Sequence, residues 1–273
     1  MKFDNILIVT DLDDTFLGEN GEYVERNLKA IDYFKKNGGR FTAATGRDYY
    51  FVKDPMPELV ALCNAPIITS NGGAIYDTEK DTIESVMSLP TEKTLDIVRK
   101  VLAYEPDISG RISLDDGYIY ESEDKVYRYD QGKYRYMTKI APFDDYLDRV
   151  WLKFTFYGDP AKISRATEYI KTLDLTGVRY VNALDENLEI LHENASKGAK
   201  LPVLKEYFGE PGLKIAAIGD FYNDLEMISA ADIPATVENG AEVLKRIPGV
   251  HVTCKNTKGA IADLIEYIEN SII

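Results

Sequence analysis

The chain has 273 residues, 45% of them hydrophobic and 29% charged, which is enough apolar material for one large domain or two modest ones. Its 32 basic and 46 acidic residues give a formal net charge of −14, which argues against nucleic-acid and anionic-membrane partners because both bind basic surfaces. The two cysteines lack metal-binding spacing, and we find neither a signal peptide nor an apolar run near the ~20 residues of a membrane span, so we expect a cytoplasmic protein.

The first third of the chain alternates short apolar runs with an amphipathic stretch. Residues 5–10 form a continuous apolar run, which is typical of a parallel strand buried on both faces. Apolar side chains then recur every three or four positions from Val24 to Phe34, which predicts a helix. Further strands are predicted at 40–45 and 66–70. This order of strand, helix and strand predicts right-handed crossovers and a parallel sheet.

The pattern changes from about Thr82 to His192, where strands alternate apolar and polar residues. Strands are predicted at 151–157 and 188–191, with a helix at 160–173 between them. This pattern favours an inserted α+β domain built on an antiparallel sheet. Its many tyrosines, from Tyr118 to Tyr136, have two interpretations: a sugar or aromatic pocket, or exposed strand faces, packing and subunit contacts. We favour the second.

The parallel pattern resumes after residue 196. The expected elements are helices at 200–208 and 260–268 and strands at 213–218, 233–237 and 250–253. The fold class predicted is therefore α/β, with a doubly wound, Rossmann-like parallel-sheet core. Residues 1–81 and 193–273 would form this core, and residues 82–192 would form the inserted α+β domain.

Polar residues follow four of the predicted parallel strands. These groups are Asp11 to Thr15, Thr45 to Arg47, Ser70 to Gly73, and Gly219 to Asp224. Each group alone is typical of an ordinary turn or helix cap. The carboxyl ends of parallel strands meet at one edge of a sheet, where ligands bind in open α/β folds. We therefore expect these groups to form one site.

The acidic residues of these groups indicate phosphoryl chemistry assisted by magnesium. Several carboxylates in one crevice repel one another unless a cation lies among them, and oxygen ligands without Cys or His suit Mg²⁺. Asp11 and Asp13 are two residues apart, so an extended backbone would place both on one side. One carboxylate can then attack phosphorus while the other transfers a proton. Thr45 and Lys197 are available to stabilise the phosphoryl oxygens.

The segment Asp11-Leu12-Asp13-Asp14-Thr15 resembles the DxDxT signature of the haloacid dehalogenase superfamily. Thr45, Lys197 and the segment 219–224 match the second, third and fourth motifs of that superfamily in order. The segments 44–47, 70–73 and 196–198 resemble those of its Cof-type branch. Members of that branch carry an α/β cap domain between the second and third motifs, which is where the insert lies here.

The resemblance implies a role for each matching residue. Asp11 would be the nucleophile that becomes phosphorylated, and Asp13 would protonate the leaving oxygen and then activate water. Thr45 and Lys197 would hold the phosphoryl group. The implied direct metal ligands are Asp11, Asp220 and the backbone carbonyl of Asp13. Asn223 and Asp224 would complete or orient the metal shell. The implied substrate contacts are Arg47, Asn71 and Gly72.

One residue departs from the resemblance, because Asp14 stands where the superfamily most often has glycine. Aspartate tolerates unusual backbone angles better than most residues do, so the turn can survive. Its extra carboxylate lies near an anionic substrate. We therefore expect Asp14 to affect the rate and the substrate preference rather than the type of reaction.

The function predicted is a magnesium-dependent phosphatase of small metabolites that acts through an aspartyl-phosphate. A sugar phosphate is the first expectation for the substrate, and a phosphorylated cofactor such as pyridoxal phosphate is the second. The cap would close over the substrate, and the protein would be a monomer or a homodimer. A phosphomutase is the enzymatic alternative, and a non-hydrolytic phospho-receiver or a catalytically dead binding protein is the alternative outside enzymes.

Overall fold

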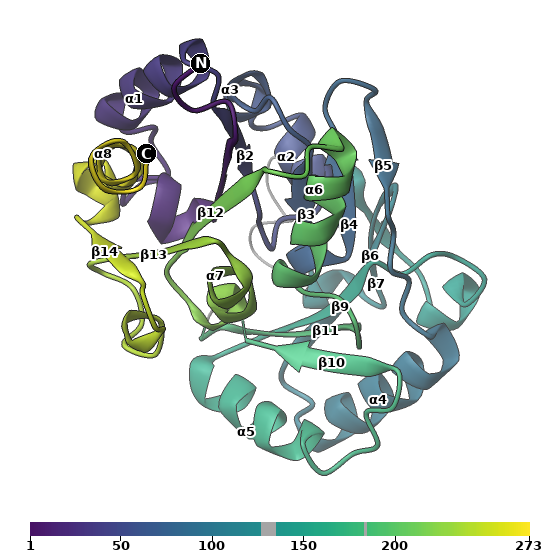
Figure 1. The fold of residues 1–273 in the computed structure, drawn as a ribbon. Helices are drawn as coiled ribbons and strands as arrows, with labels where there is room; N and C mark the ends of the chain where they lie inside the picture. Colours follow the sequence, from purple (N-terminus) through teal and green to yellow (C-terminus); the bar gives the residue numbers. More distant parts are fainter. Residues whose placement is uncertain (127–134, 183–184) are drawn as a thin grey trace. The chain divides into compact units, whose positions relative to one another are not determined.

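The computed structural model describes residues 1–126, 135–182 and 185–273, and these residues form two compact units (Figure 1). The core unit comprises Met1–Arg47, Phe51–Glu84 and Ser196–Ile273, and the insert unit comprises Asp48–Tyr50 and Ser85–Ala195. The domain limits expected from the sequence, 81/82 and 192/193, lie three residues from the corresponding unit limits. The segment Asp48–Tyr50 was not expected in the insert unit.

A five-stranded parallel sheet organises the core unit, in the order β14-β13-β12-β1-β2. Every residue of β1 is buried, as a continuous apolar run between two helical layers requires. The predicted doubly wound sheet is thereby confirmed. Its strands are β1 (Ile6–Thr10), β2 (Arg40–Ala43), β12 (Lys214–Gly219), β13 (Ile233–Val237) and β14 (His251–Thr253).

Helices cover both faces of this sheet. On one face α1 (Glu25–Lys36) packs beside α8 (Ala260–Ser271), and the two lie together in Figure 1. On the other face α6 (Leu201–Phe208) and α7 (Leu225–Ala230) share a hydrophobic cluster with β1 and β12. The apolar periodicity predicts α1, α6 and α8 but not α7. It also does not predict the short helices α2 (Tyr50–Lys53) and α3 (Pro57–Leu62).

The strand predicted at 66–70 is present, but it lies outside the five-stranded parallel sheet and its ladder is antiparallel. Strand β3 (Ile67–Thr69) pairs antiparallel with β4 (Ala74–Asp77), which pairs with β5 (Thr82–Glu84) in a separate three-stranded sheet. An isolated parallel bridge from Ala44 to Ile68 joins β3 to the end of β2. The cause is a tight turn after β3, in which Ser70 and Asn71 have φ values of 52° and reverse the chain at once.

The insert unit is an α+β layer, as predicted, with the sheet order β10-β11-β9-β6-β7-β8. All its strand pairs are antiparallel except β7 with β8. The strands are β6 (Ser109–Leu114), β7 (Gly117–Tyr120), β8 (Thr138–Ile140), β9 (Lys153–Tyr157), β10 (Val178–Val181) and β11 (Asn187–His192). Helices α4 (Thr91–Tyr104) and α5 (Pro160–Ile170) pack on one face of this sheet through a cluster that includes Ile112, Phe154 and Ile190.

The tyrosines of the insert do not share one environment. Tyr118 and Tyr120 are buried, whereas Tyr136 is exposed. Tyr127, Tyr129 and Tyr134 lie outside the described residues. None of the helices in the described parts of the chain combines the length and the apolar character that a membrane span needs.

Candidate active site

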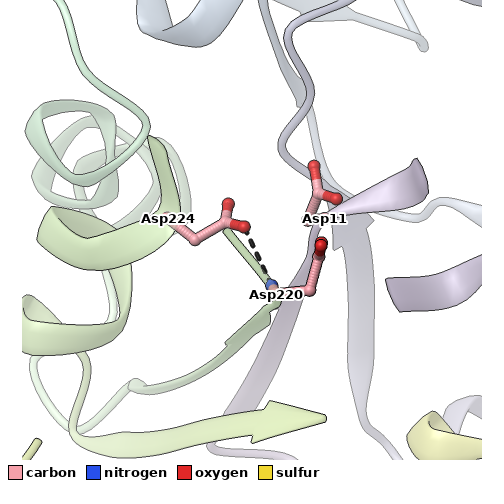
Figure 2. Close-up of side chains that lie close together, drawn as sticks. All are labelled: Asp11, Asp220 and Asp224. Carbon is pink, nitrogen blue, oxygen red and sulfur yellow. Dashed lines mark hydrogen bonds between the residues drawn. The ribbon is translucent and has the colours of Figure 1, made fainter. Parts of the chain in front are cut away.

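Three carboxylates meet at the carboxyl ends of two neighbouring core strands. Asp11 directly follows β1, and Asp220 directly follows β12, the neighbour of β1 in the sheet. Asp224 follows four residues later, and one oxygen from each of the three side chains lies within 4.8 Å of the others. Figure 2 shows the carboxylate of Asp220 pointing toward Asp11, and that of Asp224 turned toward the backbone of Asp220. The expected convergence at this sheet edge is therefore present for these three residues.

Gly219 makes this arrangement possible. A Cβ atom at residue 219 would lie 2.3 Å from the carboxyl carbon of Asp224, so a larger residue would displace this side chain. In its observed position, Oδ2 of Asp224 accepts hydrogen bonds from the backbone N–H groups of Asp220, at 3.0 Å, and Phe221, at 3.2 Å. Asp224 thereby fixes the turn that carries Asp220.

Lys197 supplies the positive charge of this cluster. Its side chain is fully buried, and Nζ donates to Oδ1 of Asp11 at 2.5 Å and to Oδ1 of Asp224 at 2.7 Å. Burial alone would lower the pKa of Lys197, but the two carboxylates outweigh it and the net shift is upward. The ammonium is therefore retained, and it offsets one of the three negative charges.

Burial, together with the remaining negative charge, makes ionisation of Asp11 and Asp220 unfavourable. Burial is the main cause that raises the pKa of Asp11 well above its usual value of 3.8, against the opposing effect of Lys197. Burial, followed by the charge of Asp224, raises the pKa of Asp220 to about 6. Thr15 donates to Oδ1 of Asp220 at 2.7 Å and orients this side chain. Thr15 stands in the first motif, but its role at Asp220 is not predicted by the sequence pattern.

The donor set of this cluster fits a hard divalent cation. With all groups ionised, three carboxylates and one ammonium leave two negative charges. The three side chains that could bind a metal ion all offer oxygen atoms as ligands. Both oxygens of Asp224 are engaged by Lys197 and the backbone, so this residue orients the others. Asp11 and Asp220 are thus the direct side-chain ligands that the geometry favours.

Asp13 lies outside the three-carboxylate group, and its partner is Arg47. Nε of Arg47 donates to Oδ2 of Asp13 at 3.0 Å, and Nη2 donates to Oδ1 at 2.5 Å. The expected projection of Asp11 and Asp13 to one side assumed an extended backbone, but a helical turn begins at Leu12, between the two residues, and Asp14 follows with a left-handed φ of 59°. Arg47, expected at the substrate, here binds the side chain expected to transfer the proton. Aspartate at residue 14 adopts this glycine-like conformation, and Nδ2 of Asn239 donates to its carbonyl at 2.9 Å.

Thr45, Asn71 and Asn223 are connected beside this cluster. The backbone N–H of Asn71 donates to the carbonyl of Thr45 at 3.0 Å, and Nδ2 of Asn223 donates to Oδ1 of Asn71 at 3.0 Å. The hydroxyl of Thr45 accepts from the backbone N–H of Arg47 at 3.1 Å. These loops therefore support one another at the strand ends.

Gly72 has a packing role. It has a φ of +87°, and a Cβ atom there would lie 2.1 Å from the carbonyl oxygen of Ser196. This close approach places the loop after β3 against the residue that precedes Lys197. The geometry does not by itself assign a substrate contact to Gly72.

Comparison with known proteins identifies the family. The family model described as haloacid dehalogenase-like hydrolase matches residues 8–265. A 5-amino-6-(5-phospho-D-ribitylamino)uracil phosphatase of Bacillus subtilis is 24% identical, over 96% of this chain and 97% of that protein. A pyridoxal phosphate phosphatase of Escherichia coli is 23% identical, over 95% of this chain and 97% of that protein.

A solved structure gives the same result for the fold. It is that of a haloacid dehalogenase-like hydrolase from Bacteroides thetaiotaomicron, with a TM-score of 0.78, 25% identity, and coverage of 96% of this chain and 98% of that one. The resemblance drawn from the four sequence motifs is confirmed. The chain belongs to the haloacid dehalogenase-like hydrolases, in their Cof-type branch, and is an enzyme of the phosphatase class.

Proposed function

We propose that this protein is a magnesium-dependent phosphatase of small phosphorylated metabolites, with Asp11 as the residue that becomes phosphorylated. The observation that carries the proposal is the position of Asp11. Its carboxylate is buried beside Asp220 and Asp224 and bonded to the ammonium of Lys197 at 2.5 Å. A buried nucleophile next to fixed positive charge is what attack on an anionic phosphate requires.

We propose Asp11, Asp220 and the backbone carbonyl of Asp13 as the groups that would hold Mg²⁺, with Asn223 and Asp224 orienting them. When bound, the cation would neutralise the repulsion between nucleophile and phosphate and the charge that develops on the phosphoryl oxygens. The two negative charges that remain when all four groups are ionised support this proposal.

In the first half-reaction, a carboxylate oxygen of Asp11 attacks phosphorus, and the bond from phosphorus to the ester oxygen breaks. Asp13 donates a proton to that oxygen, and the alcohol leaves. In the second half-reaction, Asp13 takes a proton from water, whose oxygen attacks phosphorus and breaks its bond to Asp11. Lys197 and Thr45 would hold the phosphoryl oxygens through both steps.

The ion pair of Asp13 with Arg47 gives this mechanism an additional requirement. Two hydrogen bonds from the guanidinium hold both carboxylate oxygens of Asp13. Asp13 can accept and donate protons only after one of these bonds is exchanged. We therefore propose that Arg47 positions Asp13 between turnovers.

The relatives support a proposal for the chemical class of the substrate, not for an individual compound. Two relatives are named for a ribityl phosphate and for pyridoxal phosphate, which are both small phosphorylated metabolites. A sugar phosphate and a phosphorylated cofactor therefore remain the two expectations. The insert unit would serve as the cap. The cytoplasmic location and the monomeric or dimeric state stay predictions.

The direct test is Asp11→Asn in a phosphate-release assay with p-nitrophenyl phosphate and with a panel of phosphorylated metabolites, with and without Mg²⁺. We expect turnover and trapped phosphoenzyme to vanish while the circular dichroism spectrum is unchanged. Asp32→Asn is the matched control, because Asp32 is an exposed carboxylate in α1. Undiminished turnover of the Asp11→Asn protein would contradict the proposal.

The same panel separates the alternatives. A phosphomutase would move the phosphoryl group to a second hydroxyl of a phosphosugar without stoichiometric release of phosphate. A receiver would keep its phosphoryl group, and a binding protein would hydrolyse nothing in the presence of Mg²⁺.

A further inference from the structure

Three asparagine side chains hold the backbone that directly follows Asp13. They come from three separate parts of the core unit, which are helix α1, the loop after β13, and the segment between β14 and α8. We call these three residues the asparagine clamp. Each of them donates its amide N–H to a backbone carbonyl of the turn: Asn239 to Asp14 and Asn256 to Leu17, both at 2.9 Å, and Asn27 to Phe16 at 3.4 Å.

Two of the clamp residues also use their acceptor oxygens. Oδ1 of Asn239 accepts from the backbone N–H of Asn256 at 3.0 Å. Oδ1 of Asn27 accepts from the backbone N–H groups of Ile261 and Ala262, in the first turn of α8, at 3.1 Å each. A side-chain amide donates and accepts at once, whereas a carboxylate only accepts. Asparagine is therefore suited to join the turn of the first motif to the C-terminal part of the chain.

The backbone conformation of Asp14 explains why the turn needs this support. Its left-handed φ of 59° is unfavourable for a residue that carries a Cβ atom. Such a conformation persists only where the surrounding structure fixes it from several sides. Asn239 bonds to the carbonyl of Asp14 itself, and the same loop donates the N–H of Ala241 to the carbonyl of Asp220 at 2.8 Å. One loop therefore joins the turn after β1 to the turn after β12.

We propose that the asparagine clamp positions Asp13 for proton transfer. The side-chain hydrogen bonds of the clamp described above all go to backbone groups, so its members are positioning residues. Arg47 holds the side chain of Asp13, and the clamp holds the backbone that follows it. A general acid must lie within hydrogen-bond reach of the leaving oxygen, so a displaced Asp13 slows esters of basic alcohols most. This inference rests on the proposed phosphatase function.

The most direct variant is Asn239→Asp, because Asn239 is exposed and the substitution keeps the shape of the side chain. The new carboxylate can still accept from the N–H of Asn256, but it has no proton to donate to the carbonyl of Asp14. Asn256→Asp tests a buried member of the clamp in the same way. Asn270→Asp, at an exposed residue of α8, is the matched control. Combining Asn239→Asp with Glu238→Gln restores the net charge of the loop.

The catalytic measurement compares kcat/KM for benzyl phosphate and p-nitrophenyl phosphate, which both carry one aromatic ring. This ratio reports the steps up to formation of the phosphoenzyme, so the attack of water does not enter it. The p-nitrophenolate ion leaves without a proton, whereas benzyl alcohol requires one. We expect Asn239→Asp to lower kcat/KM about tenfold for benzyl phosphate, which is part of the roughly 10²- to 10⁴-fold effect of a positioned general acid. The value for p-nitrophenyl phosphate should change little, and the double variant should behave like Asn239→Asp.

The structural measurement follows amide hydrogen exchange of the full-length protein by mass spectrometry, and it does not depend on activity. The N–H of Leu17 donates to the carbonyl of Leu12 at 2.9 Å. The N–H of Gly18 donates to that of Glu22 at the same distance, so exchange in a peptide over residues 12–22 reports opening of the turn. Both clamp variants should raise this exchange about tenfold, the effect of one lost hydrogen bond. Exchange in β1 and in the Asn270→Asp protein should be unchanged.

Unchanged exchange in both clamp variants would overturn the proposal. Raised exchange with an equal loss of kcat/KM for both esters would also overturn it, because the clamp would then have a structural role only. Recovery of kcat/KM in the double variant would do the same, because the effect would then come from the added charge. Absent turnover of every ester by the wild-type protein, with exchange raised in the clamp variants, would support the hold of the clamp on the turn and contradict the phosphatase proposal alone.

Discussion

Magnesium should stabilise the folded protein far more at about pH 7.5 than at about pH 4.5. Asp220 has its pKa raised from 3.8 to about 6, first by burial and then by the charge of Asp224. Between these two values the folded state binds the proton more tightly than the unfolded state. Without metal, this group's contribution to the free energy of unfolding is therefore present below pH 3.8 and is lost as the pH rises through about 6.

The size of this loss follows from the shift. A displacement from 3.8 to about 6 corresponds to about 3 kcal/mol for Asp220, and the raised pKa of Asp11 adds to it in the same direction. A cation binds the deprotonated carboxylates of the folded state, so magnesium should restore this free energy at the higher pH and have little effect at the lower pH.

Urea unfolding at the two pH values, with millimolar MgCl₂ or with EDTA, measures the effect. Other carboxylates also titrate in this range, so the quantity of interest is the difference between wild type and Asp220→Asn, with Asp32→Asn as the surface control. The Asp220→Asn protein should lose the contribution of Asp220 to the pH dependence of the free energy of unfolding. It should also lose most of the stabilisation by magnesium. An equal magnesium effect at both pH values in the wild type would refute the reasoning.

Three further substitutions test the neighbouring contacts. Lys197→Met should cost about 3–5 kcal/mol in the absence of metal because it leaves buried carboxylates uncompensated, and thermal melts with and without Mg²⁺ should show that the cation recovers part of the loss. Gly219→Ala should abolish turnover and cost about 1–3 kcal/mol, because its Cβ would overlap the carboxyl group of Asp224, and wild-type activity in that variant would contradict the packing argument. Arg47→Gln should lower kcat roughly 10- to 100-fold, because it removes the two hydrogen bonds that position Asp13. Arg47→Lys should recover only part of the lost kcat. An unchanged kcat in Arg47→Gln would exclude this positioning role.

The parallel core could be predicted from the sequence because its strands are buried on both faces, and their continuous apolar runs have few other interpretations. The pairing of β3 could not, since a turn with left-handed residues at Ser70 and Asn71 decides its partner and apolar content does not encode that turn. Helices α2, α3 and α7 span only 4 to 6 residues, which is too short for an apolar period to be recognised.

The sequence predicts which residues form the acidic cluster, but it does not predict the hydrogen bonds and ion pairs that these residues make. Strand ends that meet at one edge place Asp11 and Asp220 together whatever the loops do. The pairing of Arg47 with Asp13 depends on the turn Leu12–Phe16 that carries Asp13. The engagement of Asp224 by backbone N–H groups depends on a glycine at residue 219. Both are properties of loop conformation, which residue spacing alone does not determine.

The complete burial of Lys197 has a consequence for chemical labelling. Acetylating reagents attack the free amine, and an ammonium that is inaccessible to solvent and bonded to Asp11 and Asp224 offers them neither access nor a lone pair. Exposed lysines such as Lys29 should react within the same exposure time. The extent of acetylation at residue 197, read by mass spectrometry, would therefore report how often the folded molecule opens around its central amine.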